Sequence, residues 1–185
     1  MSKIILGGLM GLMGLGLMAC TKEASAEPQG KVARAEKPVA GAVTFQSDDD
    51  VAFTMVLPSG WTQFADPQEL SDSDNIAFEH KRKSIYGGVA IYSAEDFDGF
   101  DEFMALSEET FDVAIERSEP VSYNGFSGKR YYFEDTIDGL KLAFVSDLVS
   151  NGKYYLTSQA WVRRSLMSAN HDEIVTMFGS VALKK

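Results

Sequence analysis

The sequence predicts an α+β domain in which one antiparallel sheet of about six strands is covered by helices on both faces. Three strand-like runs are separated by Asp138-Gly139 and Asn151-Gly152, dipeptides that favour tight hairpin turns because they accept positive φ angles. Two other segments, residues 98–116 and 170–178, place apolar residues at helical spacing instead. The runs between the turns are apolar on both sides, so the sheet needs packing partners on both faces.

Strands open the folded part of the chain. Residues 51–57 alternate in the manner of a strand that ends at Pro58-Ser59-Gly60, and Trp61 follows directly. Residues 75–81 and 88–93 alternate in the same way. We expect these two strands to form a hairpin whose tip holds Lys81-Arg82-Lys83.

The strongest strand signals lie later, in residues 129–137, 140–149 and 153–163. The two dipeptides that join these runs predict a three-stranded antiparallel meander with type I′ turns. Phe144 and Leu148 should face one side of the sheet, and Val145 and Val149 the other.

Two helices are predicted beside the strands. The first covers residues 98–116 with Asp98 as its N-cap, and its acidic residues form a solvated face. The second starts at a capping box formed by Asn170 and Glu173, and Gly179 occupies the C′ position that ends it.

The N-terminus has the pattern of an export signal. Lys3 precedes an uncharged apolar run, Ile4 to Met18, which is shorter than the roughly 20 residues that span a bilayer. Its end, Leu17-Met18-Ala19-Cys20, resembles the lipobox of bacterial lipoproteins. The resemblance implies cleavage before Cys20 and attachment of lipid, including palmitate, to that cysteine.

Three parts of the chain follow from this pattern: a signal peptide over residues 1–19, the lipidated cysteine with a flexible tether over 20–42, and one folded domain over 43–185. The tether lacks aromatic residues, so it buries too little apolar surface to fold. Cys20 is the only cysteine, and the net charge is −10. The charge argues against nucleic acid and against anionic lipid surfaces as general partners, and no thiol is left for a disulfide.

The order of elements resembles the PsbP/DcrB-like superfamily. The similarity is carried by Leu57-Pro58-Ser59-Gly60-Trp61, by Tyr123-Asn124-Gly125-Phe126-Ser127-Gly128, and by the closing Phe178-Gly179-Ser180-Val181. It spans roughly residues 44–183. The resemblance implies an antiparallel sheet between helices and relatives that are mostly non-catalytic, bacterial envelope lipoproteins among them. It assigns no functional residue in this chain.

Catalytic and metal-binding patterns are weak. His80 and His171 are the only histidines, no further ligands at matched spacing accompany them, and no Gly-x-Ser-x-Gly motif occurs. The acidic stretches 72–83 and 94–105 fail the EF-hand pattern. We therefore predict no catalytic residue, cofactor or metal ligand. A calcium site of another type and a serine triad built on a histidine remain alternatives.

The sequence thus predicts a non-enzymatic lipoprotein that is anchored in a bacterial envelope membrane through acylated Cys20 and faces the periplasm. It would bind or assist a protein or another envelope component. Thr21 after the cysteine favours the outer over the inner membrane by resemblance to known sorting signals. Alternatives are a module that binds a small ligand or lipid, and a hydrolase. The candidate interaction surface comprises Trp61, Lys81, Arg82 and Lys83, with Arg163-Arg164 as further basic density.

Overall fold

The computed structural model describes residues 41–184, so the predicted signal peptide, Cys20 and nearly all of the tether lie outside the described residues. The first strand begins at Gly41, so residues 41 and 42 belong to the domain rather than to the tether. The strands are β1 (Gly41–Gln46), β2 (Ala52–Leu57), β3 (Thr62–Gln63), β4 (Ile76–His80), β5 (Ile85–Ser93), β6 (Ile115–Tyr123), β7 (Phe126–Ile137), β8 (Leu140–Ser150), β9 (Tyr154–Arg163) and β10 (Ala182–Leu183). The helices are α1 (Phe100–Thr110) and α2 (Arg164–Phe178), and the 3₁₀ turns are η1 (Pro67–Glu69), η2 (Lys81–Lys83) and η3 (Ala94–Asp96).

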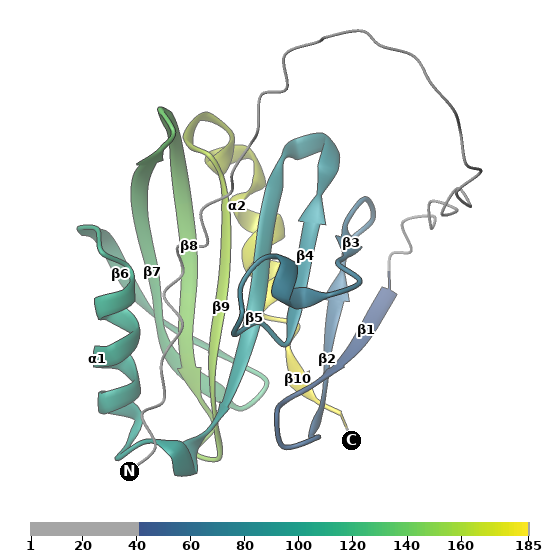
Figure 1. Cartoon of the computed structure of the whole chain (residues 1–185), viewed down its shortest axis with the longest axis vertical. Coiled ribbons are helices and arrows are strands. Elements are labelled where there is room, and N and C mark those ends of the chain that lie inside the picture. The colour runs from purple at the N-terminus through teal and green to yellow at the C-terminus, as the bar shows by residue number, and fades with distance from the viewer. Residues whose placement is uncertain (1–40, 185) are drawn as a thin grey trace, which may run out of the picture.

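The predicted α+β class with antiparallel pairing is confirmed, but the strands form two sheets rather than one. A seven-stranded sheet has the order β3-β4-β5-β9-β8-β7-β6, and a three-stranded sheet has the order β1-β2-β10 (Figure 1). Every strand pair in both is antiparallel. The last strand, β10, returns to pair with β2 and so joins the two ends of the described chain.

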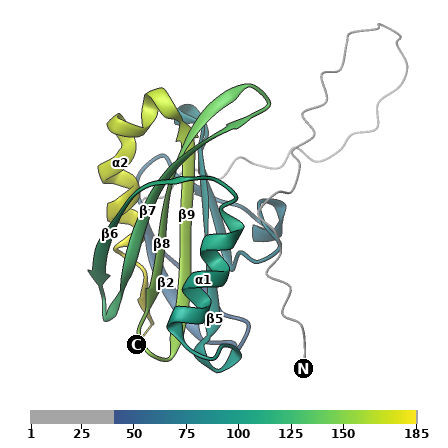
Figure 2. The same cartoon turned by 90° about the vertical axis from the view of Figure 1, so that its left-hand side faces the viewer.

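Two hydrophobic clusters lie on opposite faces of the large sheet. Val145 and Val149 of β8 join a cluster that includes Ile174 of α2 and the inner side chains of β2. Phe144 and Leu148 join a second cluster with Phe103 of α1. Because neighbouring side chains of a strand point to opposite faces, α2 and the small sheet pack on one face, here called the α2 face. Helix α1 packs on the other, the α1 face (Figure 2).

The first predicted helix is wrong at both ends. It begins at Phe100 with Gly99 as N-cap, while Asp98 has its amide bonded to the carboxylate of Glu102. After Thr110 the chain turns at Asp112, which has a φ of 48°, and continues into β6. Ile115 has helical spacing, but it lies in β6 because this segment pairs with β7. The local sequence pattern does not reveal such hydrogen bonds to a distant strand.

The second helix starts at Arg164, six residues before the predicted cap. Asn170 lies inside it and its side-chain amide donates to the Leu166 carbonyl at 2.8 Å, so no capping box forms. Gly179 does end the helix, as its C-cap, but with a φ of −62° it is right-handed rather than in the left-handed conformation that glycine often adopts there.

The meander is confirmed, with one turn of another type. Asp138 and Gly139 both have positive φ, 51° and 78°, as a type I′ turn requires. In the second turn only Gly152 has a positive φ, 84°, so the two positive angles that a type I′ turn requires are not both present. The Asn151 side chain accepts hydrogen bonds from the amides of residues 153 and 154 instead.

Candidate functional site

The predicted basic hairpin exists. β4 and β5 pair from Ile76↔Val89 to His80↔Ile85, and η2 forms the tip, which Ser84 closes with a left-handed φ of 52°. Three of the four predicted surface residues therefore lie at one turn of the sheet.

Trp61, the fourth, is not a surface residue. It is 1% exposed, and its indole N–H donates to Glu173 Oε1 of α2 at 2.7 Å. Lys83 forms an ion pair with the other oxygen of the same carboxylate. Burial alone would raise the pKa of Glu173, but the bonds from Lys83 and Trp61 outweigh it and hold that pKa below its ordinary value. Glu173 thus links the η2 turn to α2. Because its side chain is buried, Trp61 cannot contact a partner.

Lys81 and Arg82 are the exposed part of the turn. The Lys81 ammonium lies 3.2 Å from Glu79, but its side chain is 79% exposed, and such pairs stabilise by about 1 kcal/mol or less. Arg82 is exposed and forms no ion pair with another residue of the described range. The predicted surface therefore reduces to these two cations.

His80 is enclosed beside the turn. It is 7% exposed and its ring lies 5.7 Å from that of Trp61. A Cβ atom on Gly60 would come within 2.8 Å of its Nε2, so only glycine fits there. Burial, and next the charge of Lys83, lower the pKa of this imidazole. Within residues 41–184 its Nδ1 finds no hydrogen-bond partner.

His171 contacts a tyrosine rather than a serine. Its Nε2 lies 3.0 Å from the Tyr132 hydroxyl, and its Nδ1 lies 3.0 Å from the Asp172 carboxylate. The Tyr132 hydroxyl donates to Glu119 at 2.6 Å, and the guanidinium of Arg117 lies over the Tyr132 ring at 3.9 Å. The group ties α2 to β6 and β7.

Sequence reasoning missed a buried ion pair on the α2 face. Arg130 of β7 donates to both oxygens of Asp147 of β8, at 2.6 and 2.8 Å, and the Asp147 side chain is 0% exposed. Burial raises the pKa of Asp147 and the hydrogen bonds from Arg130 oppose that shift. The sequence did contain a signal for this burial, because Asp147 lies two residues from both Val145 and Val149 and therefore shares their face of the strand.

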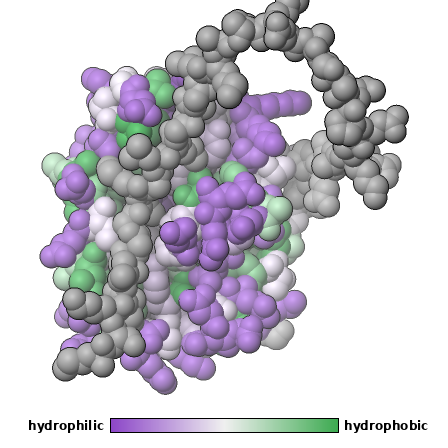
Figure 3. All heavy atoms as spheres, in the orientation of Figure 1, coloured by the Kyte–Doolittle hydropathy of each residue, from purple (hydrophilic) through white to green (hydrophobic). Residues whose placement is uncertain are grey.

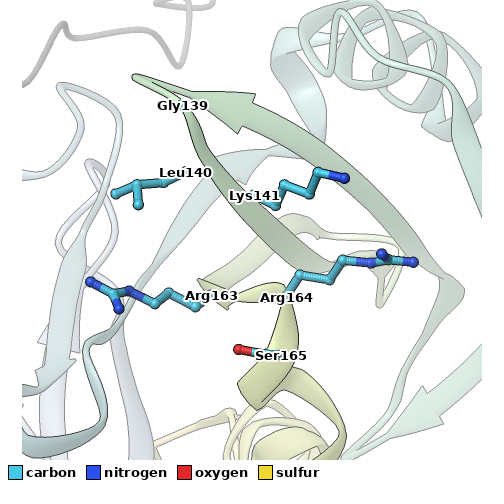
Figure 4. A pocket seen from close by; sticks show the side chains of 6 residues that line it. All are labelled: Gly139, Leu140, Lys141, Arg163, Arg164 and Ser165. Carbon is cyan, nitrogen blue, oxygen red and sulfur yellow. The ribbon is translucent and has the colours of Figure 1, made fainter.

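A second set of cations lines an open cavity of about 540 Å³ where β7–β8 meets the start of α2. Figure 4 shows Leu140 and Arg163 on one side of this hairpin and Lys141 and Arg164 on the other. Arg164 forms an ion pair with Glu134 at 2.5 Å. Arg163-Arg164, the further basic density in the sequence, thus joins Lys141 at the hairpin.

The described residues show neither a metal cluster nor a membrane span. Between Gly41 and Lys184, no group of three or more histidine, cysteine or acidic side chains could hold a metal ion. Over that same stretch no helix has both the length and the apolar character needed to cross a bilayer. The visible described surface in Figure 3 is largely hydrophilic with small apolar patches between.

Comparison with known proteins gives fold similarity alone. No protein-family model matches the chain, and no curated protein matches it in sequence. A structure from Bacteroides thetaiotaomicron matches with a TM-score of 0.54 and 14% identity over 80% of this chain, which spans only 50% of that protein. LpqN of Mycobacterium tuberculosis, described as involved in cell envelope biogenesis, matches with a TM-score of 0.58 and 10% identity over 78% of this chain and 91% of LpqN.

Cyanobacterial PsbP from Synechocystis sp. PCC 6803 also matches, with 13% identity over 85% of this chain and 100% of that one. Its TM-score of 0.39 is too low to bear on the assignment. The shared fold with the first two structures is shown, and the PsbP/DcrB-like assignment stays a prediction.

Proposed function

We propose that this protein is a lipoprotein of a bacterial envelope, anchored through acylated Cys20 and facing the periplasm. Its PsbP/DcrB-like domain, a sheet between helices, binds or assists an envelope protein without catalysing a reaction. The outer membrane is the favoured location because Thr21 follows the cysteine. The fold likeness to LpqN, a protein described as involved in cell envelope biogenesis, supports the compartment.

One observation carries the non-catalytic part: the polar groups that could act as acid or base hold elements of the fold together. Glu173 binds Trp61 and Lys83, and Asp147 binds Arg130. His171 lies between Asp172 and a tyrosine hydroxyl that already donates to Glu119. A serine triad needs a histidine that accepts a proton from a serine, and neither His80 nor His171 has a serine partner among residues 41–184.

The anchor is tested by labelling cells with palmitate. Wild-type protein should carry the label and Cys20→Ser should remain an unlabelled precursor, because the acyl chains attach to that thiol. Label on the variant at the wild-type level would overturn the anchor.

The non-catalytic reading is tested by His80→Gln with His171→Gln, which removes both imidazoles while retaining polar side chains of similar size. The double variant should fold, localise and restore the wild-type phenotype when it is produced in a deletion strain. Failure of a folded, correctly localised variant to restore that phenotype would favour the hydrolase. A thermal melt, compared with that of the wild type, verifies folding.

A further inference from the structure

Six of the eleven lysines and arginines in residues 41–184 lie at one end of the large sheet. β4, β7 and β9 run toward that end, and β5 and β8 run away from it. The η2 turn, the β7–β8 turn and the junction of β9 with α2 therefore lie next to one another (Figure 1). This region, the basic end, holds six cations: Lys81, Arg82, Lys83, Lys141, Arg163 and Arg164.

Acidic side chains gather at the opposite end. They lie in the β1–β2 turn, in η3, in the link from η3 to α1 and in the first turn of α1 (Figure 1). The members are Asp48, Asp49, Asp50, Glu95, Asp96, Asp98, Asp101 and Glu102. A domain with this separation of charge is oriented by a charged surface even though its total charge is negative.

Three cations of the basic end are available to a partner. Lys81, Lys83 and Arg164 are engaged by Glu79, Glu173 and Glu134. Arg82, Lys141 and Arg163 are exposed and form no ion pair within the described range. Two acids without an ion pair among the described residues lie on the β7–β8 hairpin itself: Asp135, whose carboxylate accepts from the Thr136 amide, and Asp138 in the turn.

Exposed aliphatic side chains accompany these cations. Ile137 is 41% exposed, Leu140 47% and Leu166 38%. Ile137 and Leu140 are cross-strand partners at the very tip of the β7–β8 hairpin, and Leu166 lies in the first turn of α2. Aliphatic groups beside lysine and arginine are what an anionic bilayer surface binds, because the cations contact headgroups while the aliphatic groups enter the interface.

We infer that the basic end docks directly on an anionic phospholipid bilayer, through Arg82, Lys141 and Arg163 with Ile137 and Leu140 at its centre. The acidic end then points away from the membrane, since like charge repels it. The contact is separate from the acyl anchor: the anchor fixes the chain to any bilayer, whereas docking orients the domain only on an anionic one.

The experiment uses the full chain purified from the membranes of cells that produce it. The protein is reconstituted into vesicles of phosphatidylcholine alone and of equimolar phosphatidylcholine and phosphatidylglycerol. Flotation reports attachment, and hydrogen–deuterium exchange reports docking. Amide exchange in residues 136–141 and 163–166 should be slower on the anionic vesicles, and exchange in residues 47–51 should be the same on both. Added salt should remove the difference, because it screens the charges.

The decisive variant is Lys141→Gln with Arg163→Gln. Each cation near an anionic surface contributes about fivefold to binding, so losing two should lower the docking equilibrium about 25-fold and abolish the protection. The matched control, Lys153→Gln with Lys184→Gln, removes the same charge away from the basic end and should retain it. Leu140→Ser should weaken the protection without changing its salt dependence.

Flotation with both vesicles but equal exchange on them would overturn docking and leave the anchor intact. Equal protection in the double variant and its control would also overturn it. Protection that instead requires added envelope protein would point to an acidic protein partner and overturn the bilayer as occupant. Failure to float with either vesicle would contradict the anchor of the proposed function, and slower exchange on added anionic vesicles would still support docking.

Discussion

The two faces of the seven-stranded sheet hold a fully buried and a half-buried acid in different ways. On the α2 face, Asp147 is fully enclosed and binds Arg130 through two hydrogen bonds. On the α1 face, the carboxyl of Asp74 lies over Gly88, where a Cβ atom would come within 2.1 Å of its Oδ2. Asp74 has no ion-pair partner in the described range, and burial raises its pKa from 3.8 to about 7. The same residue type is therefore an ion-pair partner on one face and a desolvated acid on the other.

The cover of the faces differs as well. The α2 face packs against both α2 and the inner side of β1 and β2. The α1 face packs against one 11-residue helix, and beyond it four aromatic rings lie in register across β7, β8, β9 and β5. The successive ring centroids are 4.9, 6.1 and 6.2 Å apart, in the order Phe133, Phe144, Trp161 and Tyr86. Aromatic contacts between neighbouring strands thus supply part of the packing that a second layer supplies on the α2 face.

The largest effect is expected from breaking the ion pair of the α2 face. Asp147→Ala leaves the buried Arg130 guanidinium without its partner, which should lower the free energy of unfolding by about 3–5 kcal/mol. Urea denaturation measures this change in the free energy of unfolding. Replacing both residues, Arg130→Met with Asp147→Leu, removes the unpaired charge and should cost much less. Equal losses in the single and double variants would show that the pair itself stabilises the fold.

A pH-dependent effect is expected from the α1 face. Since the folded state holds the Asp74 proton more tightly than the unfolded state, stability is highest below pH 4 with respect to this group and falls as pH rises from about 4 to 7. The loss is at most about 4 kcal/mol. Asp74→Asn should abolish the fall and exceed the wild type in stability at pH 7.5, measured by urea denaturation across that range. Asp72→Asn, which changes an exposed neighbour, should retain the slope. If the stability of Asp74→Asn fell with pH as steeply as that of the wild type, another group would be the one that titrates.

The aromatic row is tested by Phe144→Ala. Removing the ring should cost about 3 kcal/mol, at the lower end for a buried phenylalanine, because this side chain is still 8% exposed. Phe178→Ala on the α2 face, where the ring is 0% exposed, is the matched comparison and should cost more. The free energies of unfolding in urea would contradict the comparison if Phe144→Ala were the more damaging change.

The smallest loss of stability is expected from a change in the β8–β9 turn, which belongs to neither face of the sheet. Gly152→Val places a β-branched residue at a φ of 84° between β8 and β9 and should cost about 1–3 kcal/mol. Ser150→Ala, beside the turn, should cost less, although it removes a hydrogen bond to the Gly152 amide. Thermal melts measure both. An unchanged melting temperature in Gly152→Val would show that the turn tolerates another conformation.

Local patterns determined six of the ten strands (β2, β4, β5, β7, β8 and β9), the two central hairpins and the division of side chains between faces. Alternation placed Phe144 and Val145 on opposite faces of the sheet, and Asp138-Gly139 fixed a turn. Both features depend only on residues close together in the chain. Asn124-Gly125, with φ angles of 49° and 84°, carried the same signal and predicts the β6–β7 turn that the helical interpretation of residue 115 concealed.

Contacts between distant segments decided the rest. β6 is a strand because β7 is available as a partner. Trp61 is part of the core, and its buried N–H is satisfied by Glu173, 112 residues away. The sequence showed two basic clusters, but only the strand order placed them at the same end of the sheet. A side chain's exposure and partners depend on which distant segments pack against it, and one-dimensional spacing does not contain that information.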